Sequence, residues 1–419
     1  MKFEDYHISR KIKDSLAELA FRRPTDIQYK AIHPILKGDD VLAIAQTGTG
    51  KTAAFVIPTL ELLTRNHAKT RNDDSFIHTI VMEPTRELVI QVAEVFRSVG
   101  KYLDVTVLGL FGGVEQDPQI ARLKHGVDVL VCTPGRLFDL VSQGHVQLNK
   151  IQILVLDEAD QMLALGFIND IRQLIKHLPR NRQTLFFSAT INQEIKDLAY
   201  SLVTKPVKIE ISPKDPVSKH VDHYVSYIEM DDKRFFLERI IKENPDDKIL
   251  VFVRTKIRAE RVKKAMERAD IQCGTIHGDK TQQERNQVMR DFRDGTLKIL
   301  IATDVSARGI DIPNIDLVIN YDLPEQTENY VHRVGRTGRG DKFGKSISFC
   351  SKEERPLLQE IESYLTKPIN ELTIDVGTYK ETIKMTSDHT QESISSLIAE
   401  LEQIEEFDRK KNKSKKNKR

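Results

Sequence analysis

The stretch Val41-Leu42-Ala43-Ile44-Ala45-Gln46-Thr47-Gly48-Thr49-Gly50-Lys51-Thr52 joins a short apolar run to a polar loop that contains glycine, and it decides the fold of this half of the chain. The continuous apolar run is typical of a strand that is buried on both faces. Gly48 and Gly50 allow a tight turn whose backbone amides face one point, and a helix that opens at Lys51 adds its N-terminus. The order of strand, loop and helix predicts a phosphate site over residues 45–52, with Lys51 reaching the outer phosphates and Thr52 binding Mg²⁺. Ala45 stands where this motif usually has glycine.

A second polar motif follows another apolar run. Asp157-Glu158-Ala159-Asp160 comes directly after residues 153–156, so we expect the first two carboxylates at the carboxyl end of a buried strand, where α/β sheets build their sites. Asp157 is expected to hold Mg²⁺ directly or through water, and Glu158 to polarise an attacking water. Without a cation, neighbouring carboxylates would repel each other. A solvated acidic helix start is the alternative, and the four apolar residues before the motif argue against it.

Short apolar runs alternate with helical periodicity in both halves of the chain. The predicted strands are residues 41–44, 79–82, 105–108, 127–131, 153–156 and 184–187 in the first half, and residues 248–253, 272–276, 298–301, 316–319 and 345–349 in the second. Residues 257–269 and 282–292 have the periodicity of helices. Strands that alternate with helices indicate an α/β fold with a parallel sheet in each half.

The length of 419 residues exceeds what one hydrophobic core usually serves, so two domains are expected. We assign residues 1–211 to the first domain and residues 220–367 to the second. Residues 212–219 combine two prolines with polar residues and are the predicted linker. In the C-terminal extension, residues 368–419, residues 394–404 have the spacing of a short amphipathic helix. Such a helix packs on its own domain or offers a face to a protein partner.

The formal net charge of +2 is unevenly distributed along the chain. Residues 408–419 carry eight Lys or Arg and one Asp, for a charge of +7, which leaves −5 for all other residues. Such a run cannot form a core. It is typical of a disordered arm attracted to polyanions, or of a tail that only keeps the chain in solution.

Cysteine usage and the first residues bear on the compartment. Cys132, Cys273 and Cys350 stand far apart without histidines at metal-ligand spacing, so neither a disulfide framework nor a zinc module is indicated. The first residues lack the apolar core of a signal peptide, and no stretch approaches the ~18 apolar residues that span a bilayer. We therefore expect a soluble, cytoplasmic protein without a membrane partner.

Further motifs accompany the loop and the acidic box, in the order and spacing of one family. They are Pro84-Thr85-Arg86-Glu87-Leu88, Gly112-Gly113, Thr133-Pro134-Gly135-Arg136, Ser188-Ala189-Thr190, Val251-Phe252-Val253-Arg254-Thr255, Ala302-Thr303-Asp304-Val305-Ser306-Ala307-Arg308-Gly309-Ile310-Asp311 and His332-Arg333-Val334-Gly335-Arg336-Thr337-Gly338-Arg339. With them the chain resembles a DEAD-box ATP-dependent RNA helicase of superfamily two over roughly residues 3 to 350. The resemblance implies two tandem RecA-like domains, each a parallel sheet flanked by helices, followed here by a basic C-terminal tail.

For the nucleotide, the resemblance implies ATP with Mg²⁺. The segment Phe21-Arg22-Arg23-Pro24-Thr25-Asp26-Ile27-Gln28 resembles the adenine-reading Q motif of the family, and Phe3 has the position of its upstream aromatic residue. Phe21 is expected to stack on the base and Gln28 to read adenine with its carboxamide. Phe21, Thr25 and Gln28 keep the motif, whereas Ala20 and Asp26 replace a common Gly and a common Pro.

In the second half, the resemblance implies that Arg336 and Arg339 are arginine fingers, that Asp311 contacts the ribose, and that His332 links to Ser188 and Thr190. Planar donors with a permanent charge suit the dispersed negative charge of a transferring phosphoryl group. The two hydroxyls are expected to couple the two ligands, although capping a helix is an equally ordinary role for them.

The resemblance also implies RNA contacts in both halves, made mostly by small residues and arginines. They are Thr85, Arg86, Gly113, Thr133, Gly135 and Arg136 in the first half, and Arg254, Gly278, Arg285 and Thr303 in the second. Such residues hold phosphates and sugars and carry no sequence information. Aromatic residues make up only 6% of the chain and Trp is absent, so we expect weak sequence preference.

Together these features predict an ATP-dependent RNA helicase. ATP and RNA would both bridge two domains, closure would complete the ATPase site, and hydrolysis would reopen it after a short duplex has been opened locally. An ATP-gated RNA clamp with little unwinding and a DNA translocase are the alternatives. The core together with Glu353-Glu354-Arg355-Pro356-Leu357-Leu358 is similar to the RhlE-like bacterial branch.

Overall fold

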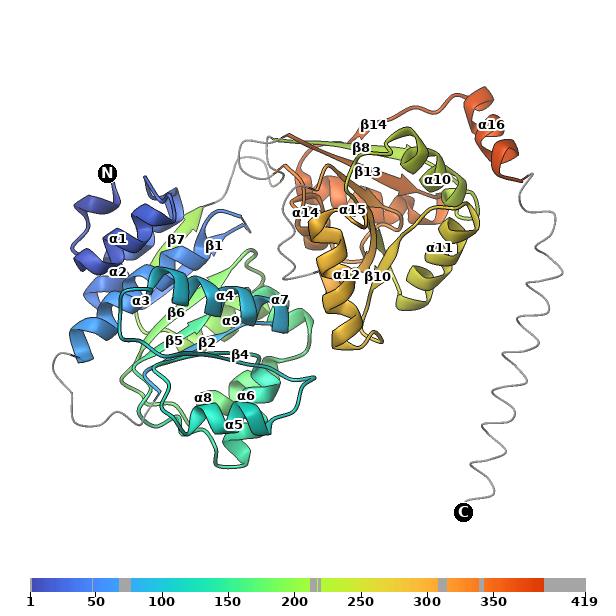
Figure 1. Ribbon diagram of the computed structural model, residues 1–419. Helices are drawn as coiled ribbons and strands as arrows, with labels where there is room; N and C mark the ends of the chain where they lie inside the picture. The colour runs from blue at the N-terminus through green and yellow to red at the C-terminus, as the bar shows by residue number, and fades with distance from the viewer. Residues whose placement is uncertain are drawn as a thin grey trace, which may run out of the picture.

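The computed structural model contains two parallel sheets, one in each half of the chain (Figure 1). It describes residues 2–46, 48–67, 77–211, 217, 220–307, 315–338 and 343–387. Outside the described residues lie Thr47, Asp311, Arg339, the predicted linker 212–219 except Val217, and the predicted helix 394–404 and basic arm 408–419 of the C-terminal extension.

The first sheet has seven parallel strands in the order β3-β4-β2-β5-β6-β1-β7. The strands are β1 (Val41–Ala45), β2 (Thr79–Met82), β3 (Val107–Leu110), β4 (Val129–Cys132), β5 (Ile153–Leu156), β6 (Gln183–Ser188) and β7 (Val207–Ile211). β2, β4 and β5 are buried along their whole length, as expected for continuous apolar runs covered on both faces.

The second sheet also has seven parallel strands, in the order β10-β11-β9-β12-β13-β8-β14. The strands are β8 (Val221–Tyr227), β9 (Ile249–Val253), β10 (Gly274–Ile276), β11 (Ile299–Thr303), β12 (Leu317–Asn320), β13 (Gly344–Cys350) and β14 (Asn370–Glu371). Adding seven to each strand number of the first sheet gives the strand order of the second sheet, so the two sheets have the same topology.

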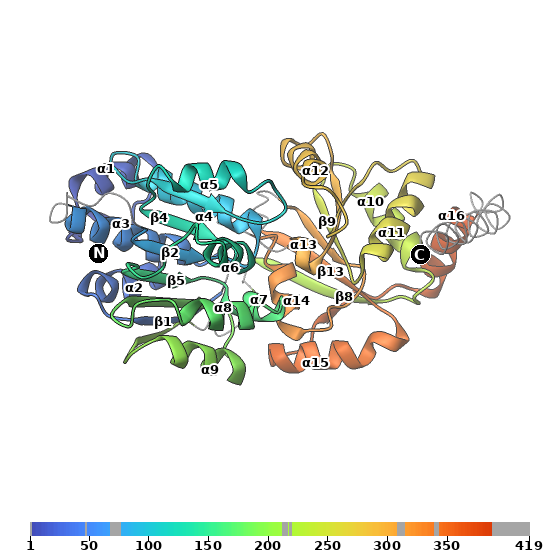
Figure 2. The same cartoon turned by 90° about the horizontal axis from the view of Figure 1, so that it is seen from below.

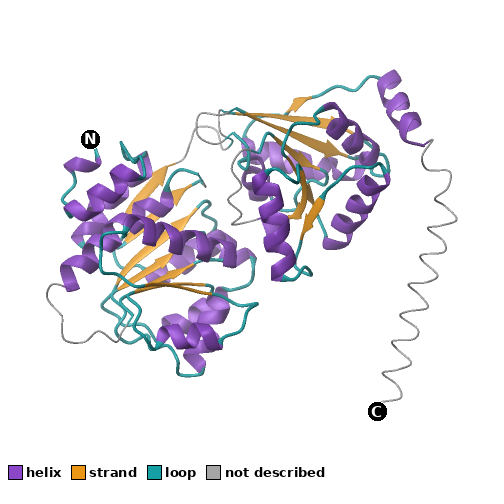
Figure 3. Cartoon of the chain, viewed as in Figure 1, coloured by secondary structure: helices purple, strands orange, loops and turns teal. Residues whose placement is uncertain are grey.

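Helices cover both faces of each sheet (Figure 3). In the first unit, one face is covered by α1 (Arg10–Glu18), α2 (Asp26–Lys37), α3 (Lys51–His67) and α4 (Arg86–Val99), and the other by α5 (Asp117–Leu123), α6 (Pro134–Ser142), α7 (Ala159–Ala164), α8 (Ile168–Ile175) and α9 (Gln193–Leu202). In the second unit, one face is covered by α10 (Lys233–Glu243) and α11 (Lys256–Arg268), and the other by α12 (Gln282–Asp294), α14 (Thr327–Val334) and α15 (Arg355–Leu365). Short helical turns complete the chain as η1 (Phe3–Asp5), α13 (Asp304–Ala307) and η2 (Lys352–Glu354). This arrangement confirms the predicted fold class of tandem RecA-like α/β units.

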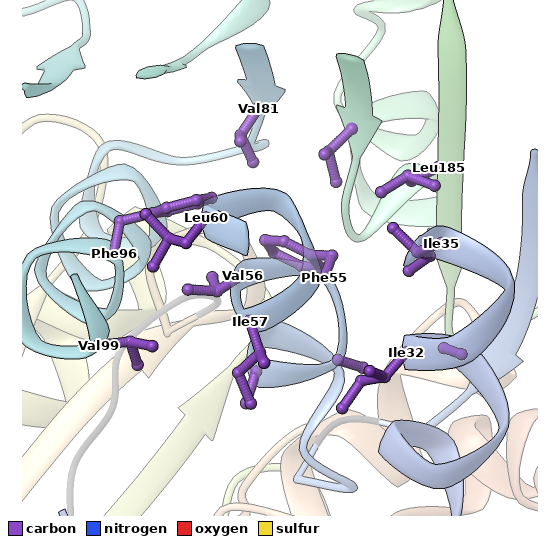
Figure 4. Packing of buried hydrophobic residues seen from close by; sticks show 14 of the residues in the cluster. Ile32, Ile35, Phe55, Val56, Ile57, Leu60, Val81, Phe96, Val99 and Leu185 are labelled. Atoms are coloured by element: carbon purple, nitrogen blue, oxygen red, sulfur yellow. The ribbon is translucent and has the colours of Figure 1, made fainter. Parts of the chain in front are cut away.

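The helix that follows the phosphate loop is held in the core of the first unit. Phe55, Ile57 and Leu60 of α3 have no exposed surface and pack between the sheet and the neighbouring helices (Figure 4). Phe55 lies 5.4 Å from Phe187 of β6, ring centre to ring centre. Full burial of side chains of this size typically contributes about 1.5–3 kcal/mol each, so the helix start is fixed against the sheet.

The second unit continues beyond residue 367, where the apolar pattern of the sequence fades. β14 pairs with β8, and α16 (Val376–Ser387) packs on α10, where the rings of Tyr379 and Phe236 are 4.8 Å apart. Part of the segment that the sequence assigns to the C-terminal extension therefore packs on the second unit. None of the described helices is long and apolar enough to cross a membrane.

Candidate functional site

The phosphate loop runs from the end of β1 to the start of α3, as the sequence predicts. Gly50 has a φ of +92°, and a Cβ atom there would lie 2.5 Å from Nε2 of Gln28. The backbone conformation therefore requires glycine, and a side chain at this position would displace the carboxamide of Gln28. Gly48 also has a positive φ, of +82°, and Thr49 donates a hydrogen bond to the carbonyl of Gln46 at 2.7 Å.

Gln28 joins the Q motif to the phosphate loop. Thr25 caps α2 in a reciprocal capping box, in which its amide donates to Oε1 of Gln28 at 3.0 Å. Nε2 of Gln28 donates to the carbonyl of Gly50 at 3.1 Å. The carboxamide keeps a second lone pair and a second N–H, so these bonds leave room for adenine.

Phe3 and Phe21 come together beside this motif. Their rings lie 6.0 Å apart, edge to face, and both side chains line a surface cavity of about 650 Å³. Arg22 and Arg23 line the same cavity. An aromatic surface with neighbouring guanidinium groups suits a flat base next to phosphates.

Lys51 is the first residue of α3 and lies in an acidic environment. Its side chain is only 5% exposed, and its ammonium lies 4.0 Å from Oδ1 of Asp157 and has no hydrogen-bond partner among the described residues. Burial works against its charge, but Asp157, Glu158 and other nearby carboxylates outweigh burial and raise the pKa of Lys51. The lysine is therefore charged, and its donors remain available for an anion.

Asp157 and Glu158 leave the tip of β5 together. Oδ1 of Asp157 accepts a hydrogen bond from the amide of Glu158 at 2.8 Å, and burial raises the pKa of Asp157. Glu158 has a φ of +50°, in the left-handed region that side chains rarely adopt, and its carboxylate accepts a hydrogen bond from Gln161. Burial is the main reason that the pKa of Glu158 is raised to about 7, while Lys51 and Arg336 lower it. Backbone strain at a buried acid is typical of active sites.

These residues fit a nucleotide with its metal. Several buried carboxylates face one lysine, so the cluster has an excess of negative charge that a divalent cation would balance. Thr52 follows Lys51 in the first turn of α3 and supplies a hydroxyl, and Asp157 supplies a carboxylate. Oxygen donors of this kind suit Mg²⁺, which also takes ligands from substrate phosphates.

Asp160, the last residue of the acidic box, connects the two units, and its sequence position alone predicts no separate role for it. Its carboxylate accepts a hydrogen bond from Thr190 at 3.3 Å and lies 3.8 Å from Nε2 of His332. The hydroxyl of Ser188 donates to the carbonyl of Thr190 at 2.8 Å. The predicted link from His332 to Ser188 and Thr190 therefore runs through Asp160, the last residue of the acidic box. α7 and α14, which carry Asp160 and His332, lie side by side (Figure 2).

Arg333 anchors the arginine segment of the second unit. Arg333 is 2% exposed and donates to Oδ2 of Asp304 at 2.8 Å and to the carbonyl of Asp322 at 2.7 Å. Arg336, one turn further, is buried and its charge acts on Glu158 of the first unit. Arg333 thus fixes the end of α14, after which Arg336 donates a hydrogen bond to the carbonyl of His332 at 3.2 Å. In the sequence, the position of Arg333 within the arginine segment is the signal that points to this anchoring role.

The RNA-contact candidates of the first unit gather at the carboxyl ends of three adjacent strands. Thr85, Gly113 and Thr133 follow β2, β3 and β4, which are neighbours in the sheet. Arg86 stacks on Phe111 at 4.4 Å.

Arg136, in the first turn of α6, is also fixed. It donates to the carbonyl of Val114 at 2.9 Å and to Oε1 of Gln119 at 3.2 Å. Gly113, beside Val114, has a φ of +76° and open space around it, and Gly135 precedes Arg136 in α6. This edge therefore offers open backbone and held guanidinium groups to a ligand.

The candidates of the second unit occupy the equivalent edge. Arg254, Gly278 and Thr303 lie at the ends of β9, β10 and β11, the counterparts of β2, β3 and β4. Arg285 of α12 reaches the first unit and forms an ion pair with Glu87 at 2.7 Å. The structure thus brings the two predicted RNA edges together, on the opposite half of each sheet from β1 and β8.

Comparison with known proteins identifies the family. The DEAD/DEAH box helicase model matches residues 25–198, and the helicase conserved C-terminal domain model matches residues 232–341. The chain is 38% identical over 363 residues to the ATP-dependent RNA helicase DbpA of Bacillus subtilis, which covers 87% of this chain and 74% of the relative. It is 40% identical over 370 residues to the ATP-dependent RNA helicase RhlB of Shewanella woodyi, with 88% and 84% covered. The chain therefore belongs to the DEAD-box family of ATP-dependent RNA helicases and is an enzyme of that class.

Solved structures agree with this assignment. Dbp5 of S. cerevisiae bound to RNA and ADP BeF3 matches with a TM-score of 0.79 at 30% identity, over 93% of this chain and 99% of that one. A Dbp5 variant bound to Nup159, Gle1, IP6 and ADP matches with a TM-score of only 0.59 at 29% identity, over 91% and 100%.

Proposed function

We propose that the chain closes around ATP and single-stranded RNA, hydrolyses ATP at the seam between its two units, and thereby opens short RNA duplexes or remodels RNA–protein complexes. The observation that carries this proposal is the approach across the seam, where His332 of one unit lies 3.8 Å from Asp160 of the other and the charge of Arg336 acts on Glu158. Neither unit holds all of these groups by itself.

Each group has a distinct task in the proposed mechanism. Lys51 and the loop amides bind the β and γ phosphates, and bound Mg²⁺ would supply positive charge to the phosphate oxygens. Glu158 orients and polarises the attacking water; its pKa of about 7 lets it accept a proton near neutral pH. Arg336, with Arg339, stabilises the charge on the transferring phosphoryl group. Phe21 and Gln28 select adenine, with Phe3 and Thr25 supporting the loop, and Asp311 contacts the ribose.

RNA binding is proposed to be coupled to this site by closure. Both RNA edges meet only when the units are together, so RNA and ATP favour the same arrangement and each strengthens binding of the other. The candidate contacts are amides, small residues and arginines, which suit the phosphate and sugar backbone. A bend that the closed edges impose on one strand would exclude its partner strand, and hydrolysis would then release it.

The test separates capture of RNA from turnover of ATP. In Glu158→Gln, we expect RNA-stimulated hydrolysis to fall by about 10²–10⁴-fold, because the general base is lost, while ATP-dependent capture of a labelled single strand is kept. Steady-state ATPase rates and fluorescence anisotropy measure the two quantities. Glu94→Gln, at an exposed site of α4, serves as the control for loss of one negative charge. If capture and turnover fell equally, the assignment of Glu158 would be wrong.

Two alternatives are outcomes of the same set of assays. An RNA clamp with little unwinding would hydrolyse ATP without separating a short duplex, and a DNA translocase would be stimulated by DNA as strongly as by RNA of equal length. The intact Glu158 and Arg336 support turnover.

Finer assignments also belong to this proposal. The relatives above are named DbpA and RhlB, so membership of the RhlE-like branch stays a prediction. The same holds for the boundaries at residues 211, 219 and 367, for a cytoplasmic location, and for protein partners of the C-terminal extension. The absence of a spanning helix among the described helices and the three buried free thiols are compatible with that location.

A further inference from the structure

Glu83 is a buried carboxylate that the proposed mechanism does not use. It follows β2 directly and has no exposed surface. Within the described part of the chain, neither of its oxygens has a hydrogen-bond partner. A buried carboxylate without partners is costly, because it has lost its hydration and gained nothing in return. Its presence at this point therefore calls for a partner other than the described polypeptide.

The sheet places Glu83 beside Asp157. β2 and β5 are parallel neighbours with Met82 opposite Leu156, and the amide of Asp157 donates to the carbonyl of Met82 at 3.1 Å. Glu83 and Asp157 are the next residues of the two strands. They leave the sheet at the same level, with the strands about 4.8 Å apart.

Strand alternation sets the direction of the Glu83 side chain. Val81 lies in the core on the face covered by α3, and Met82 lies in the core on the opposite face. Because successive side chains point to opposite faces, Glu83 points to the α3 face, as Val81 does. Lys51 opens α3 on this face, and the charge of Glu83 acts on it. Glu83 is therefore aimed into the phosphate site.

A simple role as counter-ion of Lys51 does not account for Glu83. The ion-pair partner of Lys51 is Asp157, at 4.0 Å, and no ion pair joins the described side chains of Lys51 and Glu83. Lys51 already faces Glu158 and Asp160 in addition to these two carboxylates. The two oxygens of Glu83, which have no hydrogen-bond partner among the described residues, are therefore available to donors that a bound cation brings.

We infer that Glu83 is an outer ligand of the metal that accompanies the nucleotide: its carboxylate accepts hydrogen bonds from water molecules on the Mg²⁺ that Thr52 and Asp157 hold. Mg²⁺ gives up its waters reluctantly and keeps several in sites of this kind, and each water is a donor that needs an acceptor. Partners in this outer shell typically change metal affinity by about 10–100-fold. The inference rests on the proposed function, since it takes the metal–nucleotide site as given.

The experiment measures metal binding directly and not through turnover. Mn²⁺ replaces Mg²⁺, and its binding to the full chain with saturating ADP is followed by electron paramagnetic resonance. Binding of ADP alone is measured in parallel by calorimetry with a chelator present. The variants are Glu83→Gln, which keeps the shape, and Glu83→Met, which fills the site with an apolar side chain. Glu238→Gln is the matched control, because Glu238 is also buried but pairs with Lys242 in the second unit.

In both Glu83 variants we expect the dissociation constant of Mn²⁺ in the ADP complex to rise by roughly 10-fold or more, with binding of ADP alone unchanged and Glu238→Gln equal to the unmodified chain. Unfolding by urea checks that both variants are folded; removal of a buried unpaired charge should not lower their stability. Unchanged Mn²⁺ affinity would overturn the inference. So would an equal loss of ADP binding without metal, since Glu83 would then shape the loop. Failure of the unmodified chain to bind ADP would instead refute the proposed function.

Discussion

Lys51 and Lys233 occupy equivalent positions in two sheets with one strand order, and their ammonium groups differ in their partners. Each is the first residue of the helix after the first strand of its unit, and each lies 4.0 Å from an aspartate that follows the fifth strand, Asp157 or Asp322. Nζ of Lys51 has no hydrogen-bond partner among the described residues. Nζ of Lys233 donates to two backbone carbonyls, at 2.7 and 3.3 Å, and to the carboxylate of Glu354.

Glu354 takes the place in the second unit that a phosphate is proposed to take in the first. Besides Lys233, its carboxylate accepts hydrogen bonds from the amides of Leu323 and Ser351, both at 3.1 Å, and from Arg254 at 3.2 Å. The same topology therefore has two uses. In the first unit, Lys51 has no hydrogen-bond partner among the described residues and is available to a ligand. In the second unit, Lys233 is hydrogen-bonded within the protein and forms a rigid support. Since Arg254 is an RNA-contact candidate, this support also orients the RNA edge.

Substitution of Lys233, the internal partner of Glu354, should have the largest effect on stability. Lys233→Met leaves the carboxylate of Glu354 buried without its main counter-charge, so the free energy of unfolding should fall by about 3–5 kcal/mol. Urea denaturation measures the loss, and ADP affinity should not change. Lys298→Met, at an exposed ion pair with Asp246 in the same unit, should lose less than about 1 kcal/mol. Equal losses in the two variants would remove the distinction drawn above.

Loss of the ligand-facing lysine should affect turnover instead of folding. Lys51→Met removes one charged donor from the phosphates, so RNA-stimulated ATPase activity should fall by roughly 10²–10³-fold. Its unfolding free energy should fall by less than that of Lys233→Met, because Lys51 has no hydrogen bond to lose among the described residues and its ion-pair partner Asp157 is 4.0 Å away, whereas Lys233 is hydrogen-bonded to Glu354. Steady-state kinetics and urea denaturation give the two values, and near-normal hydrolysis would exclude Lys51 from the site.

A double-mutant cycle sharpens the comparison further. Once Lys233→Met has removed the ammonium, Glu354→Gln should cost less than it does alone, because the amide needs no counter-charge. We expect an interaction energy of about 1–3 kcal/mol, measured by urea denaturation of the two single variants and the double variant. Additive losses would mean that Lys233 and Glu354 act independently.

The smallest effect concerns the RNA edge of the second unit at low pH. Burial disfavours ionisation of Glu260, but hydrogen bonds with His277, Thr275 and Lys280 outweigh it and lower the pKa of Glu260 to about 2. A carboxylate whose pKa is lowered by folding stabilises the protein at pH values above the pKa of the unfolded state, which is 4.5 for Glu260. This contribution is lost as the pH falls toward the folded-state pKa of about 2. Glu260→Gln should therefore lower the melting temperature at pH 7, with the difference shrinking below pH 4.5. A difference that is independent of pH would point to packing alone.

Most of the fold follows from local patterns, and the exceptions have physical reasons. Continuous apolar runs mark the buried inner strands. β7 and β8 are absent from the predicted strands because they contain no continuous apolar run. Their exposed and buried residues alternate instead, which is also a pattern of strands. The departure at Ala20 has a visible consequence, since Ala20 adopts a φ of +59° where glycine would meet no strain.

The candidate site was predictable where one segment supplies it. The phosphate loop and the acidic box are contiguous, so their sequence shows their chemistry. The roles of Asp160, Arg333 and Glu83 depend on partners from other strands or from the other unit, and spacing along the chain does not reveal those partners. Parallel register brings Glu83 next to Asp157 across a separation of 74 residues.

The ion pair between Glu87 and Arg285 bears on how RNA binding should respond to salt. A phosphate that takes the guanidinium of Arg285 must exchange with a carboxylate, and the released Glu87 then attracts a cation from solution. This uptake offsets part of the counterion release, which contributes about 0.7 to the logarithmic salt slope for each phosphate neutralised on a single strand. The dependence of RNA affinity on ionic strength should therefore be shallower than the number of arginines at the two edges suggests.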